Sequence, residues 1–586
     1  MSDTGVWGWG PRPVAEGRWC FRLWAPAAAR VALLLDGEPI AMQADAEGEG
    51  WYSVEAQCSA GAPYRFLIDD TDEVPDPASR WQPHGVDGAS AVPVAAGNFQ
   101  WTDSGWSGRA WETLVIYEVH VGCSGGYAGL RAQLPALAAM GITALELMPV
   151  AQFPGRRNWG YDGVFPYAPA ECYGRPDDLK ALIDAAHGLG LAVLLDVVYN
   201  HFGPQGNHLA RYAPAFFSEG TPTPWGAAID FAQPAVQQFF IDNALMWLQE
   251  YRFDGLRLDA VHAIAPQAFL AQLEQAIREA TSAGRQIHLV LENEANQAHW
   301  LESQFRAQWN DDFHNALHVM LTDETEGYYA EQAGPGRAAS LLARVLQEGF
   351  AWQGGPTRSG HPRGEPSGHL PPDRFVVFAQ NHDQIGNRAF GDRLVTQLDR
   401  QRAQCALALP LLTPMIPLVF MGEPWGSRTP FQFFTDYLPP LDEAVREGRR
   451  SEFSQFSAFA DASQRARIPD PNDPATMNAC RVALPADDDA DAQAHLAWFG
   501  AVLELRRQRL QPSLAAARSL GARALGPKAV QAGWALPEGQ WWIALNVGAD
   551  AVEHGLPDGE DLLVIGSLQD DRLHGGGSFC VRWVAV

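Results

Sequence analysis

The sequence is short of paired cysteines and of long apolar runs, and each shortage excludes a class of protein. Its seven cysteines are scattered singly through 586 residues, with no CxxC spacing. A disulfide framework is therefore not expected, and the thiols are predicted to be reduced. No stretch approaches the run of about 18 apolar residues that a membrane-spanning helix needs. We therefore expect a soluble protein with no membrane partner.

Positive charge is also scarce. The chain has 42 Lys and Arg against 69 Asp and Glu, a formal net charge of −27. This excess of acid argues against nucleic acid and anionic membrane surfaces as partners, because phosphate binding requires basic patches. The first residues lack a basic segment followed by an apolar one, so no signal peptide is expected and a cytoplasmic location is predicted.

Motifs for metals and phosphate-bearing cofactors are missing as well. No His/Cys spacing fits zinc, no acidic loop has EF-hand spacing, and no glycine-rich phosphate loop joins a strand to a helix. Oxygens near Asn200 offer only a weak signal for calcium. We predict no metal and no cofactor.

The composition is that of a folded protein with several domains. Hydrophobic residues make up 47% of the chain and charged residues 19%, and the length is too great for one core. Residues 1–100 are predicted to form a small β-sandwich, because short alternating runs are separated by regular turn signals. These runs lie at 18–26, 30–36, 51–56 and 64–69.

After residue 100 the pattern changes to strands that alternate with amphipathic helical stretches, such as 177–190 and 235–251. Eight apolar runs suit doubly buried parallel strands; they are 114–119, 143–148, 191–198, 255–259, 287–292, 305–309, 374–379 and 416–421. Residues 101–490 are therefore predicted to form a (β/α)8 TIM barrel with its active site at the carboxyl ends of the strands.

The last part of the chain returns to β-type patterns. Residues 422–485 are expected to be irregular, and 491–586 to form a C-terminal β-domain that begins with a helix at 491–509. Strand-like runs follow at 540–547 and 561–568. The predicted fold is thus a multidomain α/β chain with a central TIM barrel between an N-terminal β-sandwich and a C-terminal β-domain.

Carboxylates stand where several predicted strands end. Asp259 and Glu292 close their strands, and His382 and Asp383 follow another strand by a few residues. A pair of carboxylates with a stabilising group is the equipment for cleaving a glycosidic bond. A single Asp or His in such a place is more often structural, but several such segments in chain order favour a site.

Neighbouring residues suggest different roles for the two strand-end carboxylates. Arg257 lies two residues before Asp259, hence on the same side of the strand, and a cation there would keep Asp259 ionised as a nucleophile. Glu292 follows an apolar run with no cation near it in sequence, which suits an acid that holds its proton. Glu294, one pleat later, is a rival expected to hydrogen-bond around the site. Trp159, Trp309 and Trp425 are candidate walls for sugar rings.

Four longer strings resemble the conserved regions of the α-amylase superfamily of retaining glycoside hydrolases, and within it the maltooligosyltrehalose trehalohydrolases. They are DVVYNHFGPQGNHL (196–209), FDGLRLDAVHAI (253–264), QWNDDFHNALH (308–318) and QNHDQIGNRA (380–389). The resemblance runs nearly end to end and includes FRLWAP (21–26). The loop at 121–130 looks shorter than is usual in that family, and Glu294 replaces a residue that is commonly Asp.

The resemblance implies that Asp259 is the nucleophile, Glu292 the general acid/base and Asp383 the stabiliser of the distorted sugar. A retaining enzyme of this kind would hold the carboxyl groups of Asp259 and Glu292 about 5–5.5 Å apart. The residues that would bind substrate are Arg257, His201, His382, Tyr161, His262, Trp309, Asp311 and Asp312.

The implied reaction is hydrolysis of the α-1,4 bond between a maltooligosaccharide and a terminal trehalose, without a cofactor. The substrate would then be maltooligosyl trehalose, and a maltooligosyltrehalose synthase would be the functional partner. Two alternatives stay open at this point: an α-1,4-glucan transglycosylase such as a branching enzyme, and a non-catalytic glucan-binding protein. The oligomeric state is not predicted.

Overall fold

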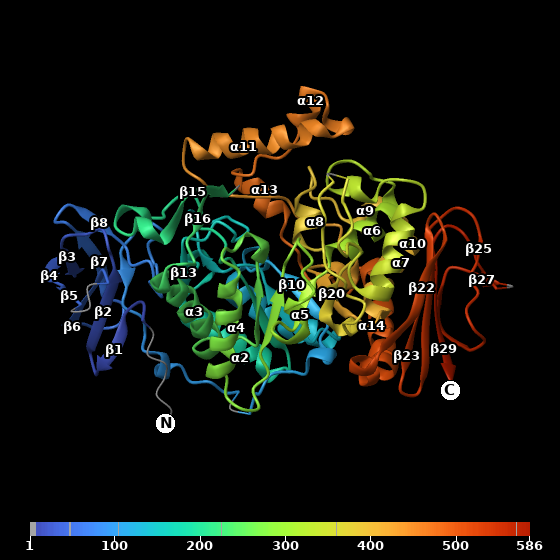
Figure 1. The fold of residues 1–586 in the computed structure, drawn as a ribbon, viewed down its shortest axis with the longest axis horizontal. Helices are drawn as coiled ribbons and strands as arrows, with labels where there is room; N and C mark the ends of the chain where they lie inside the picture. The colour runs from blue at the N-terminus through green and yellow to red at the C-terminus, as the bar shows by residue number, and fades with distance from the viewer. Residues whose placement is uncertain are drawn as a thin grey trace.

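A closed barrel of eight parallel strands forms the centre of the computed structural model, which describes residues 8–45, 49–103, 105–223, 226–358, 360–569 and 571–585 (Figure 1). The strands are β10 (Ile116–Val119), β11 (Ala144–Leu147), β14 (Ala192–Val197), β17 (Gly255–Leu258), β18 (His288–Leu291), β19 (Ala307–Trp309), β20 (Phe375–Val377) and β21 (Ile416–Phe420). Each lies inside one of the eight predicted ranges. The predicted TIM barrel is confirmed.

The inside of the barrel changes from apolar to polar along the strands. Its apolar part includes Ile116, Ala144, Ala192, Leu194 and Leu418, all fully buried in one cluster. Two residues further along their strands, Ile116 and Ala144 are followed by Glu118 and Glu146 on the same side. Because side chains alternate with period two, the charged residues all point inward near the carboxyl ends of the strands.

Helices surround the barrel, and the two predicted between its strands are confirmed as α2 (Pro176–Gly188) and α3 (Pro234–Gln249); the helix predicted at 491–509 is confirmed as α14 (Ala490–Leu505). The described residues contain no helix long and apolar enough to cross a membrane. The other helices of this layer and of the loops between strands are α1 (Gly126–Ala139), α4 (Ala268–Ala280), α5 (Trp300–Ser303), α6 (Asp311–Thr322), α7 (Arg337–Glu348), α8 (His382–Gly386), α9 (Leu394–Gln397) and α10 (Arg400–Leu412).

The N-terminal region is a sandwich of two antiparallel sheets, as predicted. Strand β3 alternates between fully and partly buried residues, which is the pattern of a strand with one face on a core. One sheet contains β1 (Arg12–Ala15), β2 (Arg18–Trp24), β6 (Trp51–Gln57) and β5 (Gln43–Ala44). The other contains β4 (Glu38–Ala41), β3 (Val31–Leu35), β7 (Pro63–Ile68) and β8 (Asp72–Val74), with β9 (Ser90–Ala91) beside β7.

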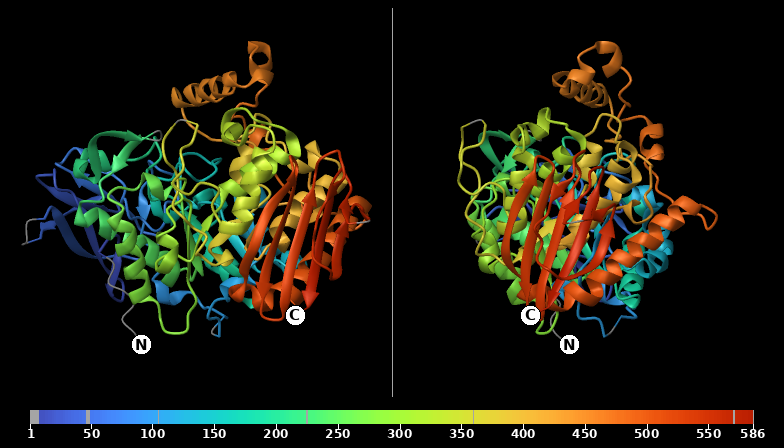
Figure 2. Two further views of the ribbon diagram at one scale, coloured as in Figure 1. Left: turned by 45° about the vertical axis from the view of Figure 1, so that its right-hand side comes forward. Right: turned by 90° about the vertical axis from the view of Figure 1, so that its right-hand side faces the viewer.

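The C-terminal region is a five-stranded antiparallel sheet on the opposite side of the barrel from the sandwich (Figures 1 and 2). Its order is β22 (Arg518–Gly526), β23 (Ala529–Leu536), β24 (Gly539–Asn546), β29 (Ser578–Ala585) and β26 (Glu560–Ile565). The strand predicted at 561–568 is interrupted at Gly566, which has a positive φ of 75°. A small sheet of β25 (Val552–Glu553), β28 (Arg572–Leu573) and β27 (Leu568–Gln569) lies beside it.

The segment predicted to be irregular contains helices, so that prediction is wrong in part. They are α11 (Leu441–Glu452), α12 (Ala462–Arg465) and α13 (Pro474–Ala479). Helix α11 is stabilised by its charges: Asp442 and Glu443 lie in its first turn, and Arg449 and Arg450 in its last. Figure 1 shows α11 and α12 projecting from the body, on the side of the barrel where α8 lies.

Two short β-hairpins lie in the loops that connect the barrel strands. They are β12 (Ala151–Gln152) with β13 (Phe165–Pro169), and β15 (Phe217–Thr223) with β16 (Gly226–Ile229).

Candidate active site

The structure brings the three predicted carboxylates to the same end of the barrel. Asp259 directly follows β17, Glu292 directly follows β18, and Asp383 is the second residue of α8, beyond β20. Arg257, inside β17, joins the first two: its Nη1 donates to Asp259 Oδ1 at 2.8 Å, and its Nη2 lies 3.0 Å from Glu292 Oε2. One guanidinium thus contacts both carboxyl groups.

Arg257 is itself held rigidly from two sides. The side chain is fully buried, and Nη1 also donates to both carboxylate oxygens of Asp196 at 2.8 Å. Its guanidinium carbon lies 4.1 Å from the centre of the Trp309 ring. Trp309 is 2% exposed. The Trp309 ring therefore packs against the Arg257 guanidinium. A direct contact between Trp309 and substrate stays a prediction.

Glu292 has no cation near it in sequence, but the fold brings one to it in space. Strands β17 and β18 are paired, so the Arg257 side chain reaches Glu292 across the sheet. Burial nevertheless raises the pKa of Glu292 well above its ordinary value; Arg257 opposes this, while the charges of Asp259, Asp383 and Asp311 add to it. The raised pKa favours the protonated form of Glu292, which is the form that a general acid needs.

Asp383 differs from Glu292 because of a neighbouring histidine. Burial works to raise the pKa of Asp383, but the charge and hydrogen bond of His382, together with Arg257, lower it overall. His382 Nε2 lies 3.3 Å from Asp383 Oδ1. The Asn381 side chain caps α8 by accepting from Asp383 N at 2.9 Å, so the helix start fixes both residues.

Tyr161 and His201 form the wall beside Asp259. The Tyr161 hydroxyl donates to Asp196 Oδ2 at 2.6 Å, and its ring stacks on that of His382, with centres 5.1 Å apart. His201 Nε2 lies 3.0 Å from the Tyr161 carbonyl oxygen, and its Nδ1 is hydrogen-bonded to the Asn200 side chain. Burial lowers the pKa of His201, which favours the neutral ring.

Asn200 has its polar atoms engaged within the protein. Its amide nitrogen donates to the backbone oxygen of Asp259 at 2.9 Å and to Asp259 Oδ2 at 2.8 Å. The amide therefore fixes the orientation of the Asp259 carboxylate from the side opposite Arg257.

The structure separates Asp311 from Asp312. Gln384 Nε2, on α8, donates to Asp311 Oδ1 at 3.1 Å, and burial with the charges of Asp383 and Asp312 raises the pKa of Asp311 to about 7. Asp312 is 2% exposed, and its Oδ2 accepts from Asn296 and from the backbone of Ala351, both at 2.9 Å. Asp311 faces the other site carboxylates, whereas Asp312 ties α6 to its neighbours.

Glu294 and His262 lie at the rim. The expectation that Glu294 follows the alternation of the strand is wrong, because β18 ends at Leu291. The Glu294 side chain is 72% exposed, and its Oε2 lies 3.9 Å from His262 Nε2. Their possible contacts with substrate stay a prediction.

The tryptophans predicted as sugar walls lie in different surroundings. Trp159 is 5% exposed, stacks on Phe431 and meets the His382 ring edge-on, with ring centres 5.5 Å apart. It therefore braces His382. Trp425 lines a separate cavity with Arg400, Arg428 and His495, away from the three carboxylates.

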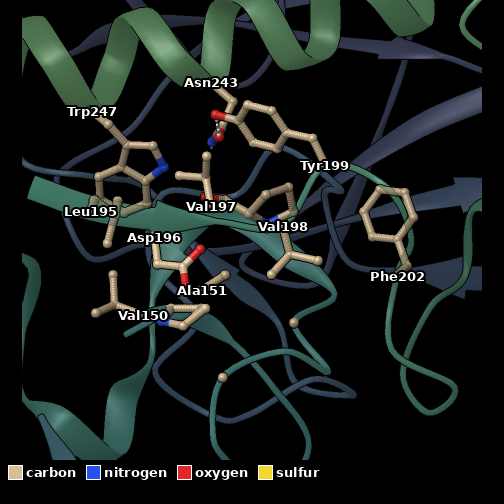
Figure 3. A pocket seen from close by; sticks show the side chains of 14 residues that line it. Val150, Ala151, Leu195, Asp196, Val197, Val198, Tyr199, Phe202, Asn243 and Trp247 are labelled. Atoms are coloured by element: carbon tan, nitrogen blue, oxygen red, sulfur yellow. Dashed lines mark hydrogen bonds between the residues drawn. The ribbon is translucent and has the colours of Figure 1, made fainter. Parts of the chain in front are cut away.

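Three buried acids of the barrel strands were not predicted: Asp196, Glu118 and Glu146. Figure 3 shows Asp196 on the barrel side of its strand, away from Trp247 and from the Tyr199–Asn243 hydrogen bond of 2.7 Å. Burial raises the pKa of Asp196 to about 6 although Arg257 opposes it. The signal was present in the sequence, since each acid interrupts an otherwise apolar strand, as in IYEV, ALEL and AVLLDV.

Comparisons with known proteins identify the family. Residues 65–214 match the family model of the alpha-amylase catalytic domain. The malto-oligosyltrehalose trehalohydrolase of Deinococcus radiodurans is 40% identical over 495 residues, which are 83% of this chain and 81% of the relative. The chain belongs to the malto-oligosyltrehalose trehalohydrolases of the α-amylase family.

A second trehalohydrolase and the solved structure of a protein described as a putative alpha amylase are also similar to this chain. The malto-oligosyltrehalose trehalohydrolase of Saccharolobus solfataricus is 36% identical over 508 residues, covering 83% of this chain and 85% of the relative. The crystal structure of a Salmonella typhimurium protein, 42% identical, superposes with a TM-score of 0.93 over 99% of this chain and 100% of that one. The similarity therefore extends beyond the barrel to both β-regions.

For a trehalohydrolase, the site offers the groups that a retaining mechanism requires. One carboxylate, Asp259, is paired with a guanidinium; one carboxyl, Glu292, is held protonated; and a third, Asp383, is held ionised. Members of the α-amylase family cleave glycosidic bonds with retention, by two displacements at the anomeric carbon.

Proposed function

We propose that this chain hydrolyses the α-1,4 bond that joins a maltooligosaccharide to a terminal trehalose, and so releases trehalose. It is a glycoside hydrolase of the α-amylase family. The observation that carries the chemistry is the shared contact of Arg257 with Asp259 and Glu292, at 2.8 and 3.0 Å. The substrate is supported by relatives that bear this activity in their names and match over more than four fifths of their length.

The proposed mechanism has two displacements. In the first, Asp259 attacks the anomeric carbon while Glu292 gives its proton to the glycosidic oxygen, and trehalose leaves. In the second, Glu292 takes a proton from water, which displaces Asp259 from the sugar. The bonds to the sugar hydroxyls that strengthen as the ring flattens would come from Asp383 and His382.

The remaining expectations belong to this proposal. Substrate would contact Arg257, His201, His382, Tyr161, His262, Trp309, Asp311 and Asp312. We propose the domain division 1–100, 101–490 and 491–586, a cytoplasmic location, and work beside a maltooligosyltrehalose synthase that supplies the substrate. A glucan as the class of substrate follows from the family.

A paired digestion tests the proposed substrate. Maltotriosyl trehalose and maltopentaose have the same number of glucose units but differ in the terminal linkage, so each is the control for the other. Chromatography should show trehalose and maltotriose from the first, and much slower cleavage of the second. Equal rates would identify a general α-1,4-glucan hydrolase, and longer or branched products without new reducing ends would identify a transglycosylase. Either result would contradict the proposal.

A further inference from the structure

A chain of three groups runs from the barrel interior to the site: Glu118 on β10, then His382, then Asp383. Glu118 is 1% exposed, and its Oε2 accepts the backbone N–H of His382 at 3.0 Å. Its Oε1 lies 2.5 Å from His382 Nδ1. On the other side of the ring, Nε2 lies 3.3 Å from Asp383 Oδ1. Both ring nitrogens therefore face a carboxylate.

We propose that Glu118 is a positioning residue, which holds His382 as an imidazolium with its Nε2–H directed at Asp383. The imidazolium thereby keeps the Asp383 carboxylate ionised and fixes its orientation. The inference rests on the proposed function in one respect, the contact of Asp383 with substrate. The protonation state of His382 can be tested independently of that function.

The geometry leaves the His382 ring no other arrangement. Tyr161 stacks on one face, with ring planes inclined by 22°, and Trp159 meets the ring at 90°. A flip of the ring would exchange its nitrogens and carbons, and would remove a partner both from the buried Glu118 carboxylate and from the partly exposed Asp383 carboxylate. An unpaired buried charge is costly. Glu118 thus selects the ring orientation as well as its charge.

The charges around His382 support the imidazolium. Burial works to lower the pKa of His382, but Asp383 and Glu118 raise it well above its ordinary value. Other titratable groups near the ring among the described residues include Tyr161, which stacks on it, Glu146 on β11 and His120 after β10. His120 is neutral, because burial lowers its pKa to about 4.

Glu146 provides a matched comparison. It pairs with Glu118 in the barrel register and is equally buried, at 1% exposure. Among the described residues its carboxyl oxygens have no hydrogen-bond partner. Burial, with the charges of Glu118 and Asp196, raises its pKa well above the ordinary value. Glu146 is therefore uncharged at neutral pH, and glutamine would be close to it in shape and charge.

The test is Glu118→Gln, with Glu146→Gln as control, in full-length protein labelled with 15N-histidine. The His382 signal is assigned by its loss in His382→Asn. In the wild type, both His382 nitrogens should carry protons at pH 7, because the two neighbouring carboxylates raise the pKa of the ring. In Glu118→Gln the His382 ring should be neutral at pH 7. The loss of this cation raises the pKa of Asp383, so the acidic limb of the kcat/KM-against-pH profile should move up by about one pH unit or more.

We expect kcat of Glu118→Gln to fall about 10- to 100-fold, with a smaller change in KM, while Glu146→Gln keeps the wild-type His382 signal and pH profile. A doubly protonated His382 in Glu118→Gln would overturn the inference, as would an equal effect of Glu146→Gln. If Glu118→Gln does not fold, the NMR titration of His382 in the wild type still tests the inference. A neutral His382 ring at pH 7 would overturn it. Failure of the proposed function would show separately, as a wild type that releases no trehalose.

Discussion

Arg257 is the residue on which the geometry of the site depends. Its guanidinium contacts three carboxyl groups, those of Asp196, Asp259 and Glu292, while its face rests on Trp309. The planar fork of arginine can reach several carboxylates at fixed angles, which the single ammonium of lysine cannot do. Arg257 was predicted from its place two residues before Asp259. Its contact with Glu292 was not, because it depends on the pairing of β17 with β18.

Arg257→Lys should therefore lower kcat about 100-fold or more, with a smaller effect on KM, since a short ammonium leaves one of the two reacting carboxyl groups without its partner. Steady-state kinetics would measure this. Arg18→Lys is the control, because the pair of Arg18 with Glu55 is solvent-exposed, with side-chain exposures of 56% and 44%. Wild-type kcat in Arg257→Lys would show that the guanidinium is not needed.

The pKa shifts of Glu292 and Asp383 predict a bell-shaped dependence of kcat/KM on pH. Asp383 must be ionised, and its pKa is lowered, so activity is lost only on strong acidification. Glu292 must be protonated, and its pKa is raised, so activity persists above the ordinary range of a carboxylic acid and falls as pH rises through that raised value. A kcat/KM profile without a basic limb would contradict the assignment of Glu292 as the acid. A basic limb that persists in Glu292→Gln would contradict it as well.

At the scale of elements, the sequence predicted best those segments whose burial is uniform. All eight barrel strands were predictable because each is a short apolar run buried on both faces. Helix α11 was missed because, of its twelve residues, only Arg449 is buried, so the helix has no apolar stripe to reveal it. Strand β22 was missed for a similar reason, since none of its residues is fully buried.

Arg449 anchors helix α11 to the site. Its Nη2 donates to the backbone oxygens of Gly386 at 2.7 Å and Arg388 at 3.1 Å, which follow Asp383 by three and five residues. The guanidinium also lies 4.7 Å from the Phe453 ring centre.

Arg449→Met should free α11 and lower kcat/KM several-fold for long substrates, at a cost of about 1–3 kcal/mol in local stability. Hydrogen exchange should rise in residues 441–465. Arg450→Met is the matched control, because the one ion pair of Arg450 with the described residues is to Glu447, at 3.1 Å, on the same helix. Unchanged exchange in Arg449→Met would contradict the anchoring role.

At the scale of the whole molecule, one hydrophobic core links the three regions. It contains Phe21 of the sandwich, Tyr117 of the barrel and Trp541 of the C-terminal sheet. At the sandwich boundary, Trp9 is fully buried; its ring centre lies 4.9 Å from that of Phe239 on α3, and its Nε1 donates to the Ala235 oxygen at 3.2 Å. We therefore expect the sandwich and the barrel to unfold together.

Trp9→Ala should lower the free energy of unfolding by about 3–5 kcal/mol, because a large buried side chain leaves a cavity. It should also split the thermal transition by uncoupling the sandwich from the barrel. Calorimetry would measure both effects. Val14→Ala is the control, since Val14 is 41% exposed. A single transition at the wild-type temperature in Trp9→Ala would contradict the coupling.

The central claim is that Asp259 forms a covalent bond to the sugar while Glu292 supplies and removes the proton. Mass spectrometry of Glu292→Gln mixed with an α-maltooligosyl fluoride tests it most directly, because fluoride leaves without a proton and the second step lacks its base. The account predicts a maltooligosyl adduct on the peptide that carries Asp259, absent in Asp259→Asn. An adduct on another residue, or release of the β-anomer as first product from the wild type, would contradict it.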